Sequence, residues 1–168
     1  MVNFMYYINI FLFFSIIGHV IENFIYTHVD SGILYGPWTP IYGFGFVLII
    51  LIANTIKKFK INKHLYPLIL FIVSAILLST LEYIGGIVIE HLYGRIFWDY
   101  SSQKFNIGRY TSLKMGLIWG ISSVLVIYII KPILDKLIKK IPKFITYILV
   151  FLFIIDIIFT IIGIGNLV

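Results

Sequence analysis

Four acidic residues interrupt long apolar runs in this chain, and their type and position could support chemistry. Glu22, Glu82, Glu90 and Asp156 are each flanked by stretches rich in Ile, Leu, Phe and Val. A carboxylate at the centre of a bilayer costs about 2.5–3.5 kcal/mol on insertion scales. A chain keeps such residues where they face a protein interior or a wet cavity. We therefore expect function to depend on these acids.

Carboxylates in such positions can bind a cation, carry protons or serve as a general base. Glu82 and Glu90 lie on one predicted helix, and their separation corresponds to about 12 Å along its axis. They are too far apart to act as a dyad with each other, although either could approach Glu22. These three glutamates are our main candidates for the lining of a polar cavity.

A metal site is a further possibility that the spacing allows us to weigh. His19 and Glu22 are three residues apart and share one helical face. Metal sites in helical bundles use carboxylates together with Glu-x-x-His pairs on facing helices. Here the order is reversed and the pair occurs once, so we predict no metal. We expect His19 to form a hydrogen bond within its own helix.

Other catalytic signatures do not occur in the sequence. It has no cysteine, no Walker A motif, no HExxH and no G-x-S-x-G. Disulfides, thiolate chemistry and a P-loop of its own are thereby excluded. We predict no cofactor, and the sequence favours a protein that is not an enzyme.

The first long connection carries an unusual run, GPWTPIYG, at residues 36–43. Proline removes a backbone donor and glycine permits positive φ, which favours an ordered, non-helical element. Such an element could dip into the outer leaflet where protein or water surrounds it. It could equally be a tight turn within an interfacial aromatic belt. Trp38 and Tyr42 are candidate aromatic walls of the cavity.

The connection at residues 93–109 mixes charged, amide and aromatic side chains, among them Trp98, Asp99, Asn106 and Arg109. Asp99 could pair with Arg109 or Arg95, and a bidentate pair would hold the connection together. Alternatively, the arginines could bind an anionic headgroup or substrate with their planar fork of donors. In either case we expect this connection to form a lid.

The composition identifies the class of protein. Hydrophobic residues make up 61% of the 168 residues, whereas soluble domains contain about 45–50%. Five segments are apolar enough to cross a bilayer, which takes about 20 residues each: residues 4–26, 42–56, 65–92, 113–130 and 144–167. We predict an all-α, polytopic bundle of about five transmembrane helices, forming a single transmembrane domain over residues 1–168.

The distribution of cations predicts the orientation. The formal net charge is +6, and most of the lysines fall in the second and fourth connections: Lys57, Lys58, Lys60, Lys63, Lys131, Lys136, Lys139, Lys140 and Lys143. The positive-inside rule places these two connections in the cytoplasm. The amino terminus is then cytoplasmic and the carboxyl terminus extracytoplasmic. Attraction to anionic lipids accounts for the clusters, so we expect no nucleic-acid partner.

A short motif occurs twice. Gly18 to Glu22 reads GHVIE, and Gly86 to Glu90 reads GIVIE. Each copy ends a helix that runs outward in the predicted topology, and an aromatic-rich connection follows each. This pattern favours two parallel hairpins plus a fifth helix, with Glu22 and Glu90 as counterparts. Parallel repeats with a site at their interface occur in transporters. Chance is the alternative, because Val and Ile are abundant here.

Several clusters in order resemble a known family. They are GPWTPIYG at 36–43, LEY at 81–83, Glu90, WDYS at 98–101, FN at 105–106, GR at 108–109 and WG at 119–120. Together they resemble the small bacterial membrane proteins of the type IV ABC-transporter, or CmpB-like, permease family. The resemblance covers most of the first four predicted helices and implies a permease that works with a separate ATPase subunit.

These observations lead to three functional hypotheses. The first is a transporter or permease with a cavity open to the extracytoplasmic side, which binds a small molecule or a lipid. The second is a membrane enzyme that acts on a lipid or lipid-linked substrate with a glutamate as general base. The third is a non-catalytic membrane subunit or regulatory partner. In all three, membrane lipids surround the chain.

Overall fold

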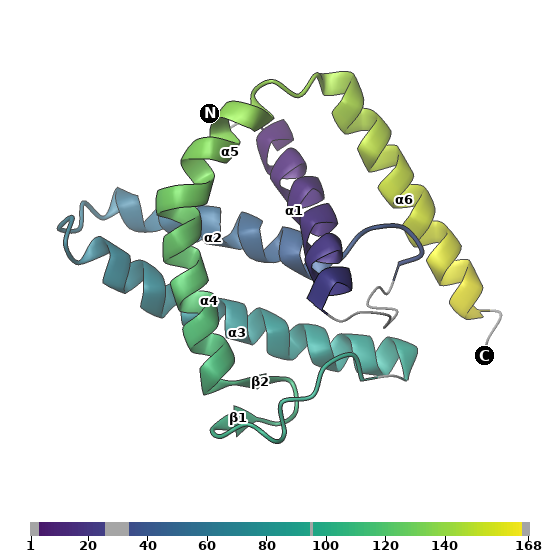
Figure 1. Cartoon of the computed structure of the whole chain (residues 1–168), viewed down its shortest axis with the longest axis horizontal. Coiled ribbons are helices and arrows are strands. Elements are labelled where there is room, and N and C mark those ends of the chain that lie inside the picture. The colour runs from purple at the N-terminus through teal and green to yellow at the C-terminus, as the bar shows by residue number, and fades with distance from the viewer. Residues whose placement is uncertain (1–3, 26–33, 95, 166–168) are drawn as a thin grey trace. The chain divides into compact units, whose positions relative to one another are not determined.

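The computed structural model describes residues 4–25, 34–94 and 96–165, and most of them are helical. The elements in chain order are α1 (Phe4–Ile25), α2 (Pro40–Lys58), α3 (Tyr66–Tyr93), β1 (Asn106–Ile107), β2 (Thr111–Ser112), α4 (Leu113–Leu125), the π-helix η1 (Val126–Ile130), α5 (Lys131–Ile138) and α6 (Lys143–Gly165). Figure 1 shows them in this order.

Five helical runs in the described residues are long and apolar enough to span a membrane, where α4, η1 and α5 count as one run. The predicted all-α, five-span class is therefore confirmed. The second run begins at Pro40 and the fourth continues to Ile138, so both are longer than predicted. Proline suits the first turn of a helix, because the N–H that it lacks would have no helical partner there.

The chain divides into two compact units. Unit 1 contains the described residues up to Val47 and those from Asp135 onward, and unit 2 contains Leu48–Leu134. Both α2 and α5 cross a boundary between the units.

In unit 1, α1 packs against α6 through small and hydroxyl-bearing residues. The buried Thr146 hydroxyl donates to Asn9 Oδ1 at 2.7 Å. Gly43, at the start of α2, lies directly against Phe11 and Ser15 of α1, where an added Cβ would clash with both. Close backbone approach at small residues and hydrogen bonds between helices are how membrane helices associate.

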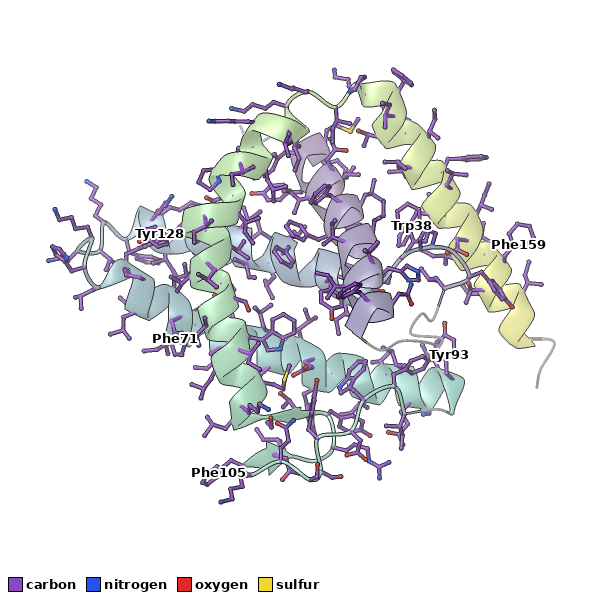
Figure 2. The ribbon with its side chains drawn as sticks, viewed as in Figure 1. Trp38, Phe71, Tyr93, Phe105, Tyr128 and Phe159 are labelled. Carbon is purple, nitrogen blue, oxygen red and sulfur yellow. The ribbon has the colours of Figure 1, made fainter. Side chains whose placement is uncertain are left out.

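In unit 2, α3 packs along α4 in the same way. Phe71 lies where α3 meets α4 (Figure 2), and its ring covers Gly120, so that a Cβ on that glycine would be 2.6 Å from the ring. One turn earlier on α4, a Cβ on Gly116 would be 3.1 Å from the Ser79 hydroxyl oxygen. Small residues thus set the distance between these two helices.

The connection between α3 and α4 is anchored at both ends. Helix α3 ends at Gly94, which has φ +60° and donates its N–H to the Glu90 carbonyl. Positive φ is readily available to glycine and costly for most other residues. Helix α4 begins after Ser112, whose side-chain oxygen caps it by accepting from the Met115 N–H. Between these caps, β1 and β2 form a small antiparallel hairpin with Ile107 opposite Thr111.

Candidate functional site

The first candidate, Glu82, lies on α3 in unit 2 and is 5% exposed. Its two carboxylate oxygens accept hydrogen bonds from the 94–112 connection. The Thr111 hydroxyl donates at 2.8 Å and the Tyr100 hydroxyl at 3.2 Å. The Trp119 side chain of α4 also lies close to this carboxylate. Its buried indole N–H has no hydrogen-bond partner among the described residues.

Glu90 lies two turns further along α3 and is held by the same connection. The Tyr110 hydroxyl donates to Glu90 Oε2 at 2.6 Å. Arg109 Nη1 lies 3.8 Å from Oε1, with both side chains partly exposed. The hydrogen bond from Tyr110 to the carboxylate raises the pKa of Tyr110 above its ordinary value, because the bond favours the protonated phenol.

Gly86 lies between the two glutamates on α3, on the same helical face. The Tyr110 ring covers this glycine, and an added Cβ would be 2.6 Å from the ring. The missing side chain therefore lets Tyr110 reach Glu90. The connection is ordered around this contact, because the Trp98 indole N–H donates to the Tyr110 carbonyl at 3.0 Å and the Tyr100 N–H donates to the Arg109 carbonyl at 2.8 Å.

Unit 1 contains a similar arrangement around Glu22. The Thr39 hydroxyl donates to Glu22 Oε2 at a long 3.4 Å, and the Tyr42 side chain is a second hydrogen-bond partner of this carboxylate. The Tyr42 ring covers Gly18 so closely that an added Cβ would clash with it. The Thr39 N–H donates to the Ser15 carbonyl at 2.9 Å, which holds the connection against α1.

We call these arrangements the first Gly–Glu–Tyr cluster, composed of Gly18, Glu22 and Tyr42, and the second Gly–Glu–Tyr cluster, composed of Gly86, Glu90 and Tyr110. The tyrosine follows the glutamate by 20 residues in both. In both, it follows the helix that carries the glutamate and covers the glycine one turn before that glutamate. Tyr42 lies in the first turn of α2, whereas Tyr110 lies in the 94–112 connection. The predicted repeat therefore has a counterpart within each unit.

His19 forms the predicted contact within its own helix, where Nε2 lies 2.8 Å from Asn23 Nδ2. Its Nδ1 is buried without a hydrogen-bond partner among the described residues. The described part of the chain contains no group of three His, Asp or Glu side chains that could hold a metal ion.

The remaining lid candidates, Asp99, Asn106 and Arg109, lie in the connection between α3 and α4. Arg109 lies against Glu90 rather than Asp99, and Arg95 is outside the described residues. The exposed Asp99 accepts from the Ser101 N–H at 2.8 Å. Bonds from the Ser101 hydroxyl and N–H lower the pKa of Asp99. The Asn106 amide donates to the Gly108 carbonyl within the hairpin turn.

Sequence reasoning missed the hydroxyl donors, namely Thr39, Tyr100, Tyr110 and Thr111. A signal was present, because Tyr42 and Tyr110 stand at the same distance after the repeated Gly-x-x-x-Glu motif. Extending the comparison of the two motifs past the helices would have found Tyr110. Nothing comparable marks Tyr100, which reaches Glu82 through the path of the connection.

Comparison with known families identifies the chain. A family model described as "Putative ABC-transporter type IV" matches residues 9–161. The chain belongs to this family. The match covers most of the length of each of the five candidate spans, and it contains both Gly–Glu–Tyr clusters. It confirms the resemblance seen in the sequence. Searches of curated proteins and of solved structures found no match.

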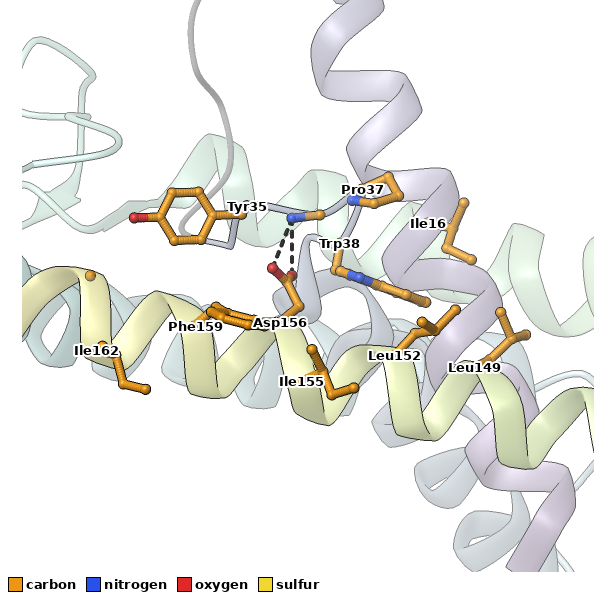
Figure 3. A pocket seen from close by; sticks show the side chains of 12 residues that line it. Ile16, Tyr35, Pro37, Trp38, Leu149, Leu152, Ile155, Asp156, Phe159 and Ile162 are labelled. Carbon is orange, nitrogen blue, oxygen red and sulfur yellow. Dashed lines mark hydrogen bonds between the residues drawn. The ribbon is translucent and has the colours of Figure 1, made fainter.

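A separate polar position in this family member is Asp156, on α6 of unit 1. Both of its carboxylate oxygens lie 3.0 Å from the Gly36 N–H, which donates to them. The segment that contains Gly36 continues through Trp38, whose N–H donates to the Gly36 carbonyl at 2.8 Å. An open groove of about 790 Å³ lies between this segment and α6 (Figure 3).

Proposed function

We propose that this transporter-type membrane protein is a permease that binds a cationic or zwitterionic small molecule or lipid headgroup at its glutamates. The observation that carries this proposal is the environment of Glu82. Its carboxylate is nearly fully buried, yet the groups that donate hydrogen bonds to it are two neutral hydroxyls, those of Tyr100 and Thr111. Among the described residues, no Lys, Arg or His forms an ion pair with Glu82 or Glu22.

A carboxylate held by hydroxyl groups alone keeps most of its attraction for a cation. A neutral hydrogen bond contributes about 0.5–1.5 kcal/mol net, so an incoming ammonium group can displace such a donor or bind beside it. An Arg or Lys partner would instead neutralise the site. Glu90 differs, because Arg109 lies 3.8 Å away, and we assign it a lesser part in binding.

The other candidate residues would complete the site. Asp99, Asn106 and Arg109 belong to the 94–112 connection, which donates to Glu82 and Glu90 and would form the lid. Trp38, Tyr42 and Trp98 would supply aromatic walls, and His19 lies one turn from Glu22 on α1. We further propose that Glu22 takes part in binding in unit 1, and Glu82 and Glu90 in unit 2.

We place the cavity opening on the extracytoplasmic side, with the amino terminus in the cytoplasm and the carboxyl terminus outside. The lysine distribution supports this orientation. Because the chain has no cysteine, single-cysteine variants can test it with an impermeant thiol reagent on intact cells. Lys104→Cys should be labelled and Lys63→Cys should not. The reverse pattern would overturn the orientation.

The energy source, in this proposal, is a separate ATPase subunit. The family is of ABC-transporter type, and this chain has no Walker A motif of its own. Affinity purification from the native membrane should recover a protein with a P-loop in a constant ratio to this chain. Recovery of the chain without any such protein would contradict an ATP-driven mechanism.

Exchange flux in proteoliposomes tests the binding role without an energy source. With choline, betaine and lactate as probes, we expect choline or betaine to exchange and lactate not to. Glu82→Gln and Glu22→Gln should abolish exchange. Asp135→Asn, which removes a charge that accepts from Tyr6, is the matched control and should retain it. Undiminished exchange in both glutamine variants would refute the proposal.

A further inference from the structure

The groove beside α6 is lined almost entirely by apolar side chains. Aliphatic residues of α1 and α6 form most of its wall, namely Ile16, Leu149, Leu152, Ile155 and Ile162. The aromatic residues Tyr35, Trp38 and Phe159 complete it, and among the described residues that line it Asp156 alone is charged. Figure 3 shows the Asp156 carboxylate between Tyr35 and Trp38, with Phe159 beside it on α6.

The charge of Asp156 is not explained by its contact with Gly36. One backbone N–H occupies part of the acceptor capacity of a carboxylate, which offers about four lone-pair positions. A neutral Asn would accept the same N–H. The described residues provide no cation within ion-pair distance of Asp156. A carboxylate in a membrane-spanning helix normally has a partner charge or a wet cavity, and the groove beside Asp156 leaves room for a ligand that would bring such a charge.

The aromatic residues define the chemistry of that ligand. Trp38 is 5% exposed and packs edge-on against Phe153, which fixes its ring. The Tyr35 hydroxyl lies against Gly163, two turns beyond Asp156 on α6. Aromatic faces attract cations, and Trp is the strongest of them. Aromatic rings around a carboxylate are suited to an ammonium group, and the aliphatic wall is suited to a hydrocarbon chain.

We propose that this groove binds an amphiphilic alkylammonium ion. Its cationic head would lie against Asp156 and the rings of Trp38 and Tyr35, and its chain would follow the apolar face of α6. A neutral chain would gain nothing from the carboxylate, and an anionic amphiphile would be repelled by it. The site shares Trp38 but none of the glutamates proposed for transport, so variants of Asp156 test it separately from the glutamate variants that test transport.

Contact quenching of Trp38 fluorescence tests the site in detergent-purified protein. Trp98→Phe and Trp119→Phe leave Trp38 as the single tryptophan. The probe is an alkyltrimethylammonium ion with a brominated chain, and an alkyl sulfate with the same chain is the anionic control. We expect saturable quenching by the ammonium probe, reversed by its unbrominated analogue, and no saturable quenching by the sulfate.

Asp156→Asn in this background separates binding from structure, because the amide oxygen can still accept from Gly36. We expect the variant to unfold at nearly the same temperature and to bind the ammonium probe at least about tenfold more weakly. Asp135→Asn removes the same charge elsewhere in unit 1 and should bind like the parent.

Equal quenching by the sulfate, or unchanged affinity in Asp156→Asn, would show that the chain merely partitions into an apolar groove and would overturn the proposal. If Asp156→Asn proves unstable, Phe159→Leu provides the second variant. That residue is 61% exposed, and the substitution keeps an apolar side chain while removing the ring. It should weaken binding of the ammonium probe severalfold, and equal binding would contradict the aromatic contribution.

Discussion

The two Gly–Glu–Tyr clusters use the same residues at the same spacing, yet they differ in how firmly the connection is held. The second cluster has a 2.6 Å bond from Tyr110 to Glu90, a hairpin and two further hydroxyl donors on Glu82. In the first cluster, the Thr39 bond to Glu22 is 3.4 Å long. The tyrosine contact that both clusters share holds the segment after the helix against that helix. The two hydroxyl bonds to Glu82 occur in unit 2, and they require another explanation.

Glu82 is the clearest difference between the two regions. The offset that aligns Gly18 with Gly86 also aligns Phe14 with Glu82. Phe14 is buried and stacks on Phe46, so this position in unit 1 is filled by an apolar ring. Packing can therefore be satisfied without a charge at this place in the repeat. Packing alone therefore gives no reason for the carboxylate in unit 2, and the proposed binding role would supply one.

The largest expected effect comes from filling the space over either glycine. Gly18→Ala and Gly86→Ala should each destabilise the protein by about 1–3 kcal/mol, because the added methyl group meets the covering tyrosine ring. Thermal unfolding in detergent measures the change. Gly116→Ala, whose methyl group would meet a hydroxyl at 3.1 Å, is the milder control. If only one of the two glycines tolerates alanine, the clusters are not equivalent.

Removing the hydroxyl donors should distinguish the two units. Thr111→Val leaves one oxygen of the buried Glu82 unsatisfied and should cost about 1–2 kcal/mol. Thr39→Val removes the long bond to the half-buried Glu22 and should cost less than about 0.5 kcal/mol. Unfolding of the two variants side by side measures the difference. Equal costs would mean that the contact in unit 1 is as strong as the one in unit 2.

The Tyr110 contact should show itself in the pH dependence of unfolding. Because the pKa of Tyr110 is raised, the folded chain holds the phenolic proton more tightly than the unfolded chain. Its contribution is fully present below the ordinary tyrosine pKa of about 10 and is lost as pH rises further. Melting temperatures from about pH 8 to 11 should therefore fall more steeply for the parent than for Tyr110→Phe. Parallel curves would argue against the bond.

The smallest effect is expected at Arg109. Its distance of 3.8 Å to Glu90 and the partial exposure of both side chains make the pair weak. Arg109→Gln should change the free energy of unfolding by less than about 1 kcal/mol, and added salt should reduce the difference. A large, salt-independent loss would instead identify Arg109 as an essential support of the lid.

Local patterns predicted part of the candidate site and the contact of His19 within its own helix, but no pairing between distant residues. The glutamates stand out because a carboxylate in an apolar run is costly wherever the helix goes. Their partners depend on the path of the connections, which apolar periodicity does not constrain. The Asp99–Arg109 pair, one of the pairings that the sequence allows, illustrates this limit, because Arg109 lies beside Glu90 instead. The Gly36–Asp156 contact joins residues 120 apart, and no spacing rule could link them.

The sequence by itself determined that this is a five-span membrane protein with acids inside its helices, because length and hydropathy specify a spanning helix without reference to its neighbours. It also carried the repeated Gly-x-x-x-Glu motif. The tertiary structure alone decided which hydroxyl groups meet those acids, and that Asp156 lines an apolar groove. These contacts depend on where two connections fold back onto helices, a choice set by packing between distant segments.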